Sequence, residues 1–285
     1  MKTVLHALIS LFLLNTILYP SEAYSTSESI GFYTAGCIRN SQMLQDTGDG
    51  YQVIRLSRER FYGHPKLVEF IKYLGKHTSA KLNSTLLIGD MSQSTGGPLP
   101  SDHTSHQTGL DVDIMYQNQP YLNYTLSKSE REDINPISVL NAHKTAIKEG
   151  MWEKKQTAVL VLATAHPDVE RIFVNPVIKL HLCNDHKGQP WLNKIRPWYG
   201  HDGHFHVRLK CPNGSKFCEN QKAIEPGDGC GEDLKQWFIP PEEKPQSTPK
   251  PKKIRQMPEQ CMEILSNQQG NNQDIESVTG EAESY

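Results

Sequence analysis

Two short segments, 109–114 and 204–209, alternate between apolar and polar residues, and most of their polar members are acids and histidines. A period of two is typical of a half-buried β-strand, because successive side chains of a strand point to opposite faces of the sheet. The pattern therefore predicts two strands, each with one apolar face in the core. The apolar positions are Leu110, Val112, Ile114, Phe205, Val207 and Leu209, and the opposite faces carry Asp111, Asp113, His204 and His206.

The rest of the chain predicts helices and strands in an irregular order. Apolar spacing after Pro65 predicts an amphipathic helix that has proline in its first turn and ends at Gly75. Asn175 followed by proline has the pattern of a helix cap and first position. Without a regular strand–helix–strand repeat, these elements indicate an α+β fold. The predicted helices are 65–75, 157–165 and one that begins at 176, and the further strands are 85–90 and 169–174.

Two stretches, HTSHQTGLDVD starting at His103 and HDGHFH starting at His201, together hold five of the 12 histidines. An ion of the zinc type takes about four ligands, and a hydrolytic site leaves one position for water, so about three protein ligands are needed. The two predicted strands carry imidazoles and carboxylates that can meet at one point. His106, Asp113 and His206 supply the required ligands.

Other polar groups near this triad have more than one interpretation. His204 is two residues from His206 on the same strand face, so it can act beside a metal-bound water as a general base or as a donor to an oxyanion. Asp111 either orients a ligand imidazole or is a solvated strand residue. Histidines outside the two stretches are not assigned, because a lone histidine is more often structural. Four more side chains are open between a role at the site and ordinary packing or pairing: Trp191, Trp198, Tyr199 and Arg208.

The ends of the chain differ in composition from its middle. A basic start, an apolar run at 8–18 that is too short to span a bilayer, and small residues before position 24 predict a cleavable signal peptide at 1–23. One domain is predicted at 24–238. A Pro/Lys-rich linker and C-terminal segment follow at 239–265, and the polar tail at 266–285 is predicted to be disordered.

Cysteine content and charge narrow the class of protein further. All six cysteines lie after the signal peptide, which is typical of an oxidising compartment. Six cysteines allow fifteen pairings, and the local loop CPNGSKFC favours Cys211 with Cys218. No pair of CxxC motifs indicates a thiolate metal site. With 30 basic and 32 acidic residues, the chain has no charge excess that predicts nucleic-acid binding.

Four ungapped blocks resemble a known family. They are SHQTGLDVDI (105–114), RIFVNPVIK (171–179), RPWYGHDGHFHVRLKCP (196–212) and PGDGCG (226–231). Together they resemble penicillin-insensitive murein endopeptidases, which are periplasmic metallopeptidases related to the lysostaphin-type and D-Ala-D-Ala metallopeptidases. The resemblance extends from about Gly31 to Cys261. It implies a small antiparallel sheet that carries the zinc site, flanked by helices and stapled by disulfides.

The resemblance also implies roles for individual residues. The family's zinc ligands correspond to His106, Asp113 and His206, with His103 counted as a further ligand in some descriptions. His204 matches the catalytic imidazole beside the metal, and His201 matches another active-site histidine. Two more disulfides are implied, Cys183 with Cys230 and Cys37 with Cys261, and the second would tie the C-terminal segment back to the domain.

The activity implied by the resemblance is zinc-dependent hydrolysis of the D-alanyl to meso-diaminopimelyl cross-links of peptidoglycan in the periplasm. Penicillin would have no effect, since no serine nucleophile takes part. A D,D-carboxypeptidase using the same site, or a non-catalytic peptidoglycan-binding protein, are the alternatives. No membrane span is expected in the mature chain, and the sequence leaves the oligomeric state open.

Two positions differ from related patterns. The D-Ala-D-Ala dipeptidase branch has a glutamate three residues before the last zinc histidine, where this chain has Gly203. This difference groups the chain with the endopeptidases that use a histidine. A family relative has a second metal-binding DxxH pattern, where this chain has Asn141 to Lys144 with only His143 available. A second metal is therefore not predicted.

Overall fold

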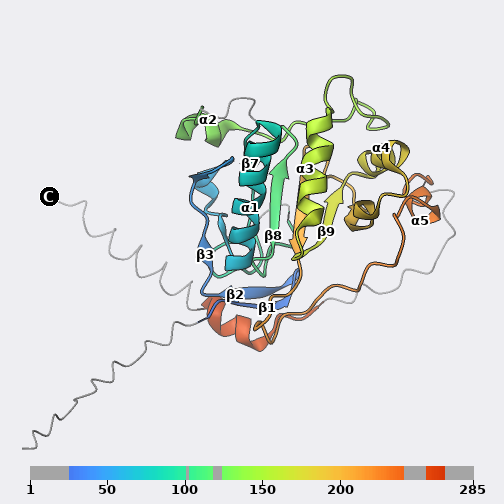
Figure 1. Ribbon diagram of the computed structural model, residues 1–285. Coiled ribbons are helices and arrows are strands. Elements are labelled where there is room, and N and C mark those ends of the chain that lie inside the picture. The colour runs from blue at the N-terminus through green and yellow to red at the C-terminus, as the bar shows by residue number, and fades with distance from the viewer. Residues whose placement is uncertain (1–25, 101–102, 118–123, 241–254, 267–285) are drawn as a thin grey trace, which may run out of the picture.

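A mixed sheet of seven strands forms the centre of the molecule, and two long helices lie across one of its faces (Figure 1). This arrangement confirms the α+β class that the sequence predicts. The order across the sheet is β10 (Ile195–Pro197), β9 (Val169–Val174), β11 (His204–Leu209), β8 (Asp111–Met115), β7 (Leu86–Ile88), β5 (Tyr51–Val53) and β4 (Thr47–Gly48).

The computed structural model describes residues 26–100, 103–117, 124–240 and 255–266. The predicted signal peptide lies outside the described residues. Most of the predicted linker and all but the first residue of the predicted tail lie outside them as well.

The centre of the sheet is antiparallel, as expected. β8 runs antiparallel to β11 and to β7, and β11 runs antiparallel to β9. On each side the sheet continues through a parallel pair, β9 with β10 and β7 with β5. In the β8–β11 register, His206 lies directly opposite Asp113, and Phe205 lies opposite Ile114. Directly opposed residues share one face of a sheet, so the two polar residues meet on one side and the two apolar residues on the other.

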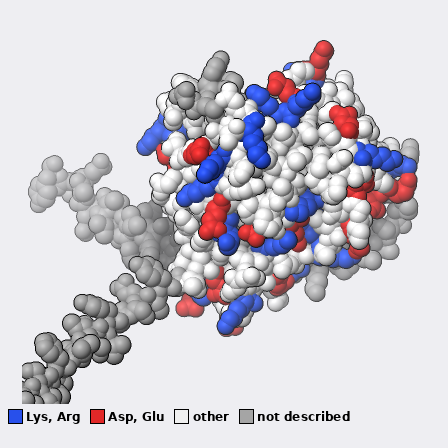
Figure 2. Space-filling model, viewed as in Figure 1, with Lys and Arg blue, Asp and Glu red and all other residues white. Residues whose placement is uncertain are grey.

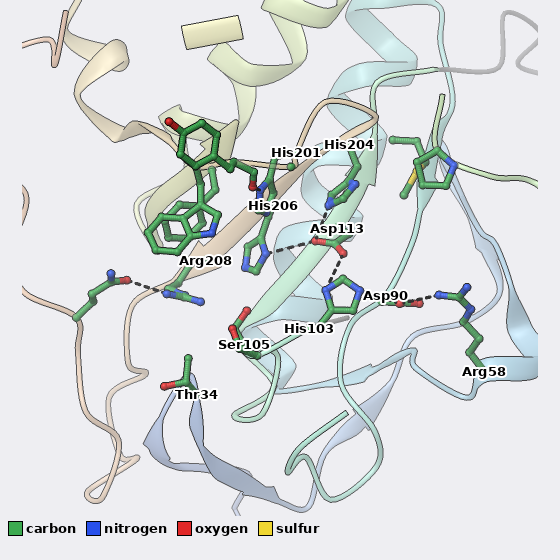
Figure 3. Close-up of a pocket in the computed structure, with 18 of the residues that line it drawn as sticks. Thr34, Arg58, Asp90, His103, Ser105, Asp113, His201, His204, His206 and Arg208 are labelled. Atoms are coloured by element: carbon green, nitrogen blue, oxygen red, sulfur yellow. Dashed lines mark hydrogen bonds and ion pairs between the residues drawn. The ribbon is translucent and has the colours of Figure 1, made fainter. Parts of the chain in front are cut away.

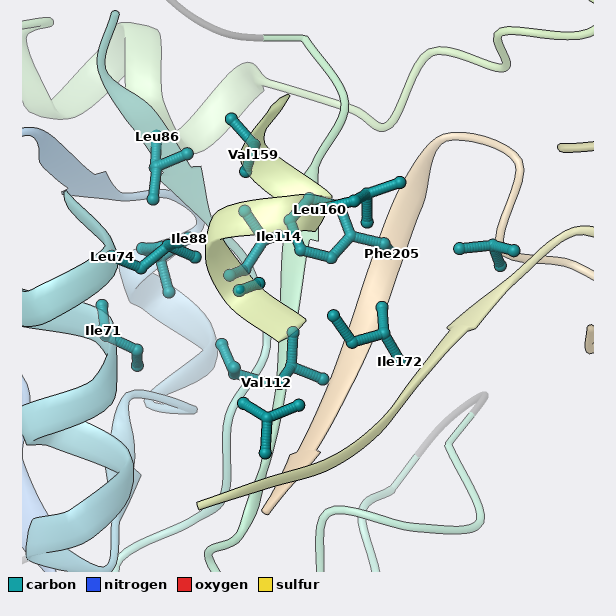
Figure 4. Packing of buried hydrophobic residues seen from close by; sticks show 14 of the residues in the cluster. Ile71, Leu74, Leu86, Ile88, Val112, Ile114, Val159, Leu160, Ile172 and Phe205 are labelled. Carbon is teal, nitrogen blue, oxygen red and sulfur yellow. The ribbon is translucent and has the colours of Figure 1, made fainter. Parts of the chain in front are cut away.

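The two long helices, α1 (Pro65–Leu82) and α3 (Lys154–Ala165), cover the apolar face of the sheet (Figures 1 and 4). Leu74 of α1 and Leu160 of α3 are completely buried in one cluster with Val112 and Ile114 of β8. Removal of this apolar surface from water stabilises the helix–sheet packing. The opposite face of β8 is left to carry Asp111 and Asp113.

α1 is longer than the sequence predicts. It begins as expected, with proline in the first turn and the His64 Nδ1 accepting a hydrogen bond from the Lys66 amide at 3.1 Å. The prediction that Gly75 ends the helix is wrong, because the helix continues to Leu82. A Cβ at position 75 would lie 2.7 Å from the Asp49 carbonyl oxygen. Gly75 therefore allows the β4–β5 turn to approach the helix closely, and it does not act as a stop signal.

The other predicted elements occur with small differences in their ends. Both 169–174 and 204–209 are strands over their full predicted length, whereas 85–90 is a strand only at 86–88. The remaining elements are β1 (Glu28–Phe32), β2 (Ala35–Arg39), β3 (Gln42–Met43), η1 (Leu56–Arg58), β6 (Tyr62–Gly63), α2 (Lys128–Asp133), α4 (Pro176–His186), η2 (Pro190–Lys194) and α5 (Glu232–Lys235).

Three disulfides join the expected cysteines. Cys211–Cys218 closes the loop after β11, and Cys183–Cys230 fastens the 226–231 loop to α4. Cys37–Cys261 links the β1–β2 hairpin to the helical segment 259–266. All three predicted pairings are confirmed, and the last one ties the C-terminal segment back to the domain.

The surface carries charges of both signs. Lys and Arg are interspersed with Asp and Glu over the face that Figure 2 shows, without a broad area of one sign. Among the described residues, no helix has the length and apolar character needed to cross a membrane.

Candidate metal centre

Asp113 of β8 lies at the centre of a cluster of imidazoles (Figure 3). The carboxylate is 3% exposed, so its charge is withdrawn from bulk water. Three ring nitrogens face its Oδ1 atom: His206 Nδ1 at 3.4 Å, His106 Nε2 at 3.5 Å and His204 Nε2 at 3.6 Å. His103 Nδ1 lies 3.7 Å from Oδ2. The structure thus brings together all four predicted metal ligands and His204.

These separations are too long for good hydrogen bonds but suit ligands that share an ion. Two atoms bound tetrahedrally at about 2.0–2.1 Å from a zinc-type ion lie about 3.3 Å apart. The buried His106 Nδ1, His106 Nε2 and Asp113 Oδ1 atoms have no hydrogen-bond partner among the described residues. Buried polar atoms without partners are costly, and a bound cation would satisfy Asp113 Oδ1 and one His106 nitrogen. The residues present therefore fit a divalent metal.

The metal-binding geometry is clearest for three residues. In the described part of the chain, His103, His106 and Asp113 form the group whose ligand atoms all lie within 4.8 Å of one another. His206 adds its Nδ1 from the neighbouring strand. Burial lowers the pKa of His206 to about 3, although Asp111 acts in the opposite direction. His206 is thus neutral at pH 7, which is the form in which imidazole binds a metal.

A strained backbone turn delivers His106 to the cluster. The residue has a φ of 69°, in the left-handed region that non-glycine residues rarely adopt. Its amide donates to Asp111 Oδ2 at 3.3 Å, and its side chain is fully buried. Such strain persists where surrounding contacts over-determine the conformation, and it is typical of functional sites.

Asp111 contacts His206 and is not exposed to solvent. It is completely buried, so the solvated alternative is wrong. Its Oδ1 atom contacts His206 Nε2 at 2.7 Å and accepts from Arg208 Nε at 2.7 Å. The first contact orients the ring so that Nδ1 faces Asp113. Burial alone would raise the pKa of Asp111, but Arg208 and His206 hold it well below the usual range.

Asp90 is a site residue that the sequence reasoning missed. It follows β7, and its Oδ2 atom lies 3.2 Å from His103 Nε2, which turns His103 Nδ1 toward Asp113. Arg58 and Arg60 both donate to the same oxygen at 3.0 Å. A polar residue at the end of a buried strand was the available signal, since the segment 85–90 ends at Asp90.

His204 and His201 lie at the open side of the cluster. The His204 side chain is 20% exposed, and its ring centroid is 5.1 Å from that of His201. His201 has a φ of 48°, and its Nδ1 lies 3.1 Å from the Tyr199 carbonyl oxygen. Burial and the neighbouring His204 lower the pKa of His201. Both imidazoles can therefore reach a molecule that lies on the cluster.

A cavity of about 550 Å³ opens over these groups. Trp198 and Tyr199 line it, whereas Trp191 packs partly buried against the core. Arg208 also reaches the cavity lining, but its guanidinium is committed to Asp111 and to Gln221 Oε1, which it contacts at 2.8 Å. Pairing with an acid on the sheet is therefore the interpretation of Arg208 that the geometry favours.

Imidazoles at ligand spacing, a buried carboxylate and a cavity over them define the class of this protein as one with a candidate hydrolytic metal centre. Comparison with known proteins agrees with this class. The family model described as penicillin-insensitive murein endopeptidase matches residues 29–266. The chain therefore belongs to that family of peptidases, whose members are hydrolases of peptide bonds.

Individual relatives support the same assignment. The chain is 42% identical over 252 residues to the penicillin-insensitive murein endopeptidase of Haemophilus influenzae, covering 87% of this chain and 85% of the relative. It is 41% identical over 242 residues to the protein of that name from Klebsiella pneumoniae, covering 84% of this chain and 86% of the relative. An Escherichia coli protein of the same name is 40% identical, with the same coverage.

Proposed function

We propose that this protein is a zinc-dependent murein endopeptidase that hydrolyses the D-alanyl to meso-diaminopimelyl cross-links of peptidoglycan and is insensitive to penicillin. The observation that carries the proposal is the buried Asp113 carboxylate, which faces four imidazoles at ligand spacing. It lines a cavity together with three of them, His103, His204 and His206. Membership of the endopeptidase family supports the choice of substrate.

In this proposal His106, Asp113 and His206 hold the zinc ion, and His103 is a further ligand. When bound, zinc supplies a water whose pKa is lowered to about 7 and a Lewis acid for the scissile carbonyl. Asp111 fixes the ring of His206, and Asp90 fixes the ring of His103. The two outer carboxylates thereby keep the ligand atoms aimed at one point before the metal arrives.

His204 is the proposed catalytic residue. Its Nε2 faces the cluster and its ring borders the cavity, so it can take a proton from the attacking water or donate to the tetrahedral oxyanion. His201 lies next to it and assists proton transfer or substrate binding at the same edge. No serine nucleophile is needed, so acylation by penicillin has no target.

The proposal places the enzyme in the periplasm. A signal peptide at 1–23 directs export, and the catalytic domain spans 24–238 with the segment 239–265 tied back by Cys261. Three disulfides are consistent with an oxidising compartment.

Mass spectrometry of purified cross-linked muropeptide dimers tests the proposal. The mature protein is incubated with dimers in zinc, in a chelator, and in zinc with penicillin. Conversion of dimers to monomers only with zinc, and equally with penicillin, supports the function. Release of free D-alanine from the stem ends while dimers persist would show a D,D-carboxypeptidase. Binding without any cleavage would show a non-catalytic wall-binding protein.

A further inference from the structure

Two arginines from η1 line the cavity beside the candidate metal centre. Arg55 precedes η1 and Arg58 ends it, and both side chains border the cavity with Asp90 and His103. Figure 3 shows Arg58, Asp90, His103 and Asp113 in succession across the pocket. The contacts between them measure 3.0 Å, 3.2 Å and 3.7 Å. Arg58 is therefore linked to Asp113 through two intervening side chains, those of Asp90 and His103.

The backbone that presents these arginines is held under strain. Arg55 and Glu59, on either side of η1, have φ angles of 55° and 52°. Contacts from α2 hold the turn in place: the Arg55 amide donates to the Arg131 carbonyl at 3.0 Å, and Glu132 accepts from the Ser57 amide at 3.2 Å. Non-glycine residues in left-handed conformations are costly, and their persistence next to an active site is typical of groups held for binding.

Two arginines, Arg55 and Arg58, and one aspartate, Asp90, line this wall of the cavity. Asp90 accepts from Arg58 and Arg60 through the same oxygen. The Arg55 Nε atom donates to the Ile134 carbonyl at 3.1 Å, and its two terminal nitrogens have no hydrogen-bond partner among the residues described. Burial and, to a smaller extent, Arg58 lower the pKa of Arg55, while Asp90, Asp113 and Glu132 act in the opposite direction. The terminal nitrogens of Arg55 are available to an anion at this position.

The opposite side of the cavity has a different character. Strand order places η1, which follows β5, and Asp90, which follows β7, on one side of β8 and β11. Trp198 and Tyr199 follow β10 on the other side and are more than half exposed. A peptide lying across the cluster therefore meets cations at one end and aromatic rings at the other.

We propose that Arg55 and Arg58 form a carboxylate-binding subsite for the substrate residue whose nitrogen belongs to the scissile amide. The inference rests on the proposed function and deepens it, because the diaminopimelyl residue of the cross-link carries a free carboxylate on the carbon bonded to that nitrogen. Paired guanidinium donors suit a carboxylate, and their position in the same cavity as His103 and Asp113 suits a group close to the scissile bond. The subsite gives the reaction a preference for an acidic leaving residue.

Two cross-linked peptides that differ in one group test the subsite. One carries the free carboxylate on the carbon bonded to the scissile nitrogen, and the other carries a primary carboxamide there. We expect the zinc-loaded wild-type enzyme to prefer the acid by about 10- to 100-fold in kcat/KM, since charge-assisted hydrogen bonds contribute that much discrimination. The Arg55→Gln/Arg58→Gln variant should lose this preference, because its kcat/KM should fall by a larger factor for the acid peptide than for the amide peptide.

A matched control and a second variant complete the test. Arg39→Gln removes an arginine that pairs with Glu28 at 3.0 Å outside the cavity, so it should keep the full preference. Should the double variant fail to fold, Arg58→Gln alone applies the same criterion, because that side chain is 38% exposed. Zinc content of each variant is measured alongside the rates.

The outcomes separate the subsite from the proposed function. Equal cleavage of both peptides by wild type overturns the subsite and leaves the endopeptidase assignment intact. The subsite is also overturned, with the endopeptidase assignment intact, if the arginine variants retain the preference for the acid peptide. Loss of zinc with an equal fall of kcat/KM for both peptides has the same meaning. Absence of cleavage of either peptide by zinc-loaded wild type overturns the proposed function, and the subsite with it.

Discussion

Asp111 and Asp113 point to the same face of β8, two residues apart, yet their surroundings differ. Asp111 Oδ1 contacts one guanidinium and one imidazole at 2.7 Å, and its Oδ2 accepts from the His106 amide at 3.3 Å, so both of its oxygens have hydrogen-bond partners. Asp113 faces four imidazoles at 3.4 Å or more and keeps an unpartnered oxygen. One carboxylate therefore orients a side chain, whereas the other is available to a metal ion.

Removal of single histidines should separate metal binding from turnover. His206→Ala removes a group that faces Asp113 at 3.4 Å, so we expect zinc binding to be abolished. His204→Ala should retain zinc and lose most turnover, by about 100-fold or more, since a general acid or base contributes about 10²–10⁴-fold. Metal analysis and muropeptide cleavage measure the two properties. Loss of zinc in His204→Ala would contradict the role proposed for His204.

At the scale of elements, close packing of a helix against another segment limits which side chains fit at individual helix positions. α1 packs so tightly on the β4–β5 turn that Gly75 has no room for a side chain. α4 buries Lys179 completely, and its Nζ donates to the Leu192 carbonyl at 2.8 Å and the Asp228 carbonyl at 2.6 Å. These contacts join α4 to η2 and to the 226–231 loop. Each element thus depends on a backbone segment that lies elsewhere in the sequence.

Gly75→Ala should destabilise the protein even though alanine favours helix. The added Cβ would meet backbone at 2.7 Å, and we expect a net loss of about 1–3 kcal/mol in the free energy of unfolding after the helix-propensity gain of about 1 kcal/mol. Urea denaturation measures the change. Lys76→Ala, at the exposed neighbouring position, is the control and should change stability by less than about 0.5 kcal/mol. A Gly75→Ala protein as stable as the wild type would show that the turn can move away.

Lys179 should make stability depend on pH in the alkaline range. Burial and the nearby Arg196 lower the pKa of Lys179 from 10.5 to about 7. Between these values the unfolded chain binds a proton that the folded chain does not, so the free energy of unfolding rises as pH increases from 7 to 10.5. Below pH 7 both states are protonated, and the contribution is constant. Urea unfolding of Lys179→Met across this range should show a smaller rise than the wild type, whereas the exposed Lys187→Met should not. Equal slopes for Lys179→Met and wild type would contradict the prediction.

At the scale of the whole molecule, the chain is closed on itself near its two ends. Cys37 and Cys261 are 224 residues apart in sequence and lie buried together with Ile30 in a small apolar cluster. Leu265 and Met257 of the C-terminal segment pack against the same cluster. The segment after the linker is therefore part of the folded body, although it follows a stretch that resembles a solvated linker in composition.

The disulfides that close the longest and the shortest loops should differ in their contribution to the free energy of unfolding. In the chain-entropy model, the 224-residue separation of Cys37–Cys261 corresponds to about 5 kcal/mol, and the separation of 7 for Cys211–Cys218 to about half as much. The paired serine variants, Cys37→Ser/Cys261→Ser and Cys211→Ser/Cys218→Ser, are compared by urea denaturation. A larger loss of stability in Cys211→Ser/Cys218→Ser than in Cys37→Ser/Cys261→Ser would show that packing around Cys211, and not chain entropy, dominates the contribution of the disulfides.

Much of the local structure and part of the site were predictable from sequence. Alternation at 204–209 predicted the strand with its correct ends and faces, and the local loop predicted Cys211–Cys218. Family resemblance added Cys37–Cys261, which no local pattern contains. The end of α1 was mispredicted because the reason for Gly75 is a turn about 25 residues earlier, at Asp49.

The sequence by itself determined that 169–174 and 204–209 are strands, that a helix begins at Pro65, and which face of 204–209 is apolar, because these features follow from neighbouring residues. It also identified the histidines and Asp113 as candidate ligands through their residue types and spacing. Only the tertiary structure decided that Asp111 is buried, that Asp90 orients His103, and that the η1 arginines border the same cavity. Those relations depend on strand order and on contacts between distant segments, and a one-dimensional pattern carries no information about which distant segments meet.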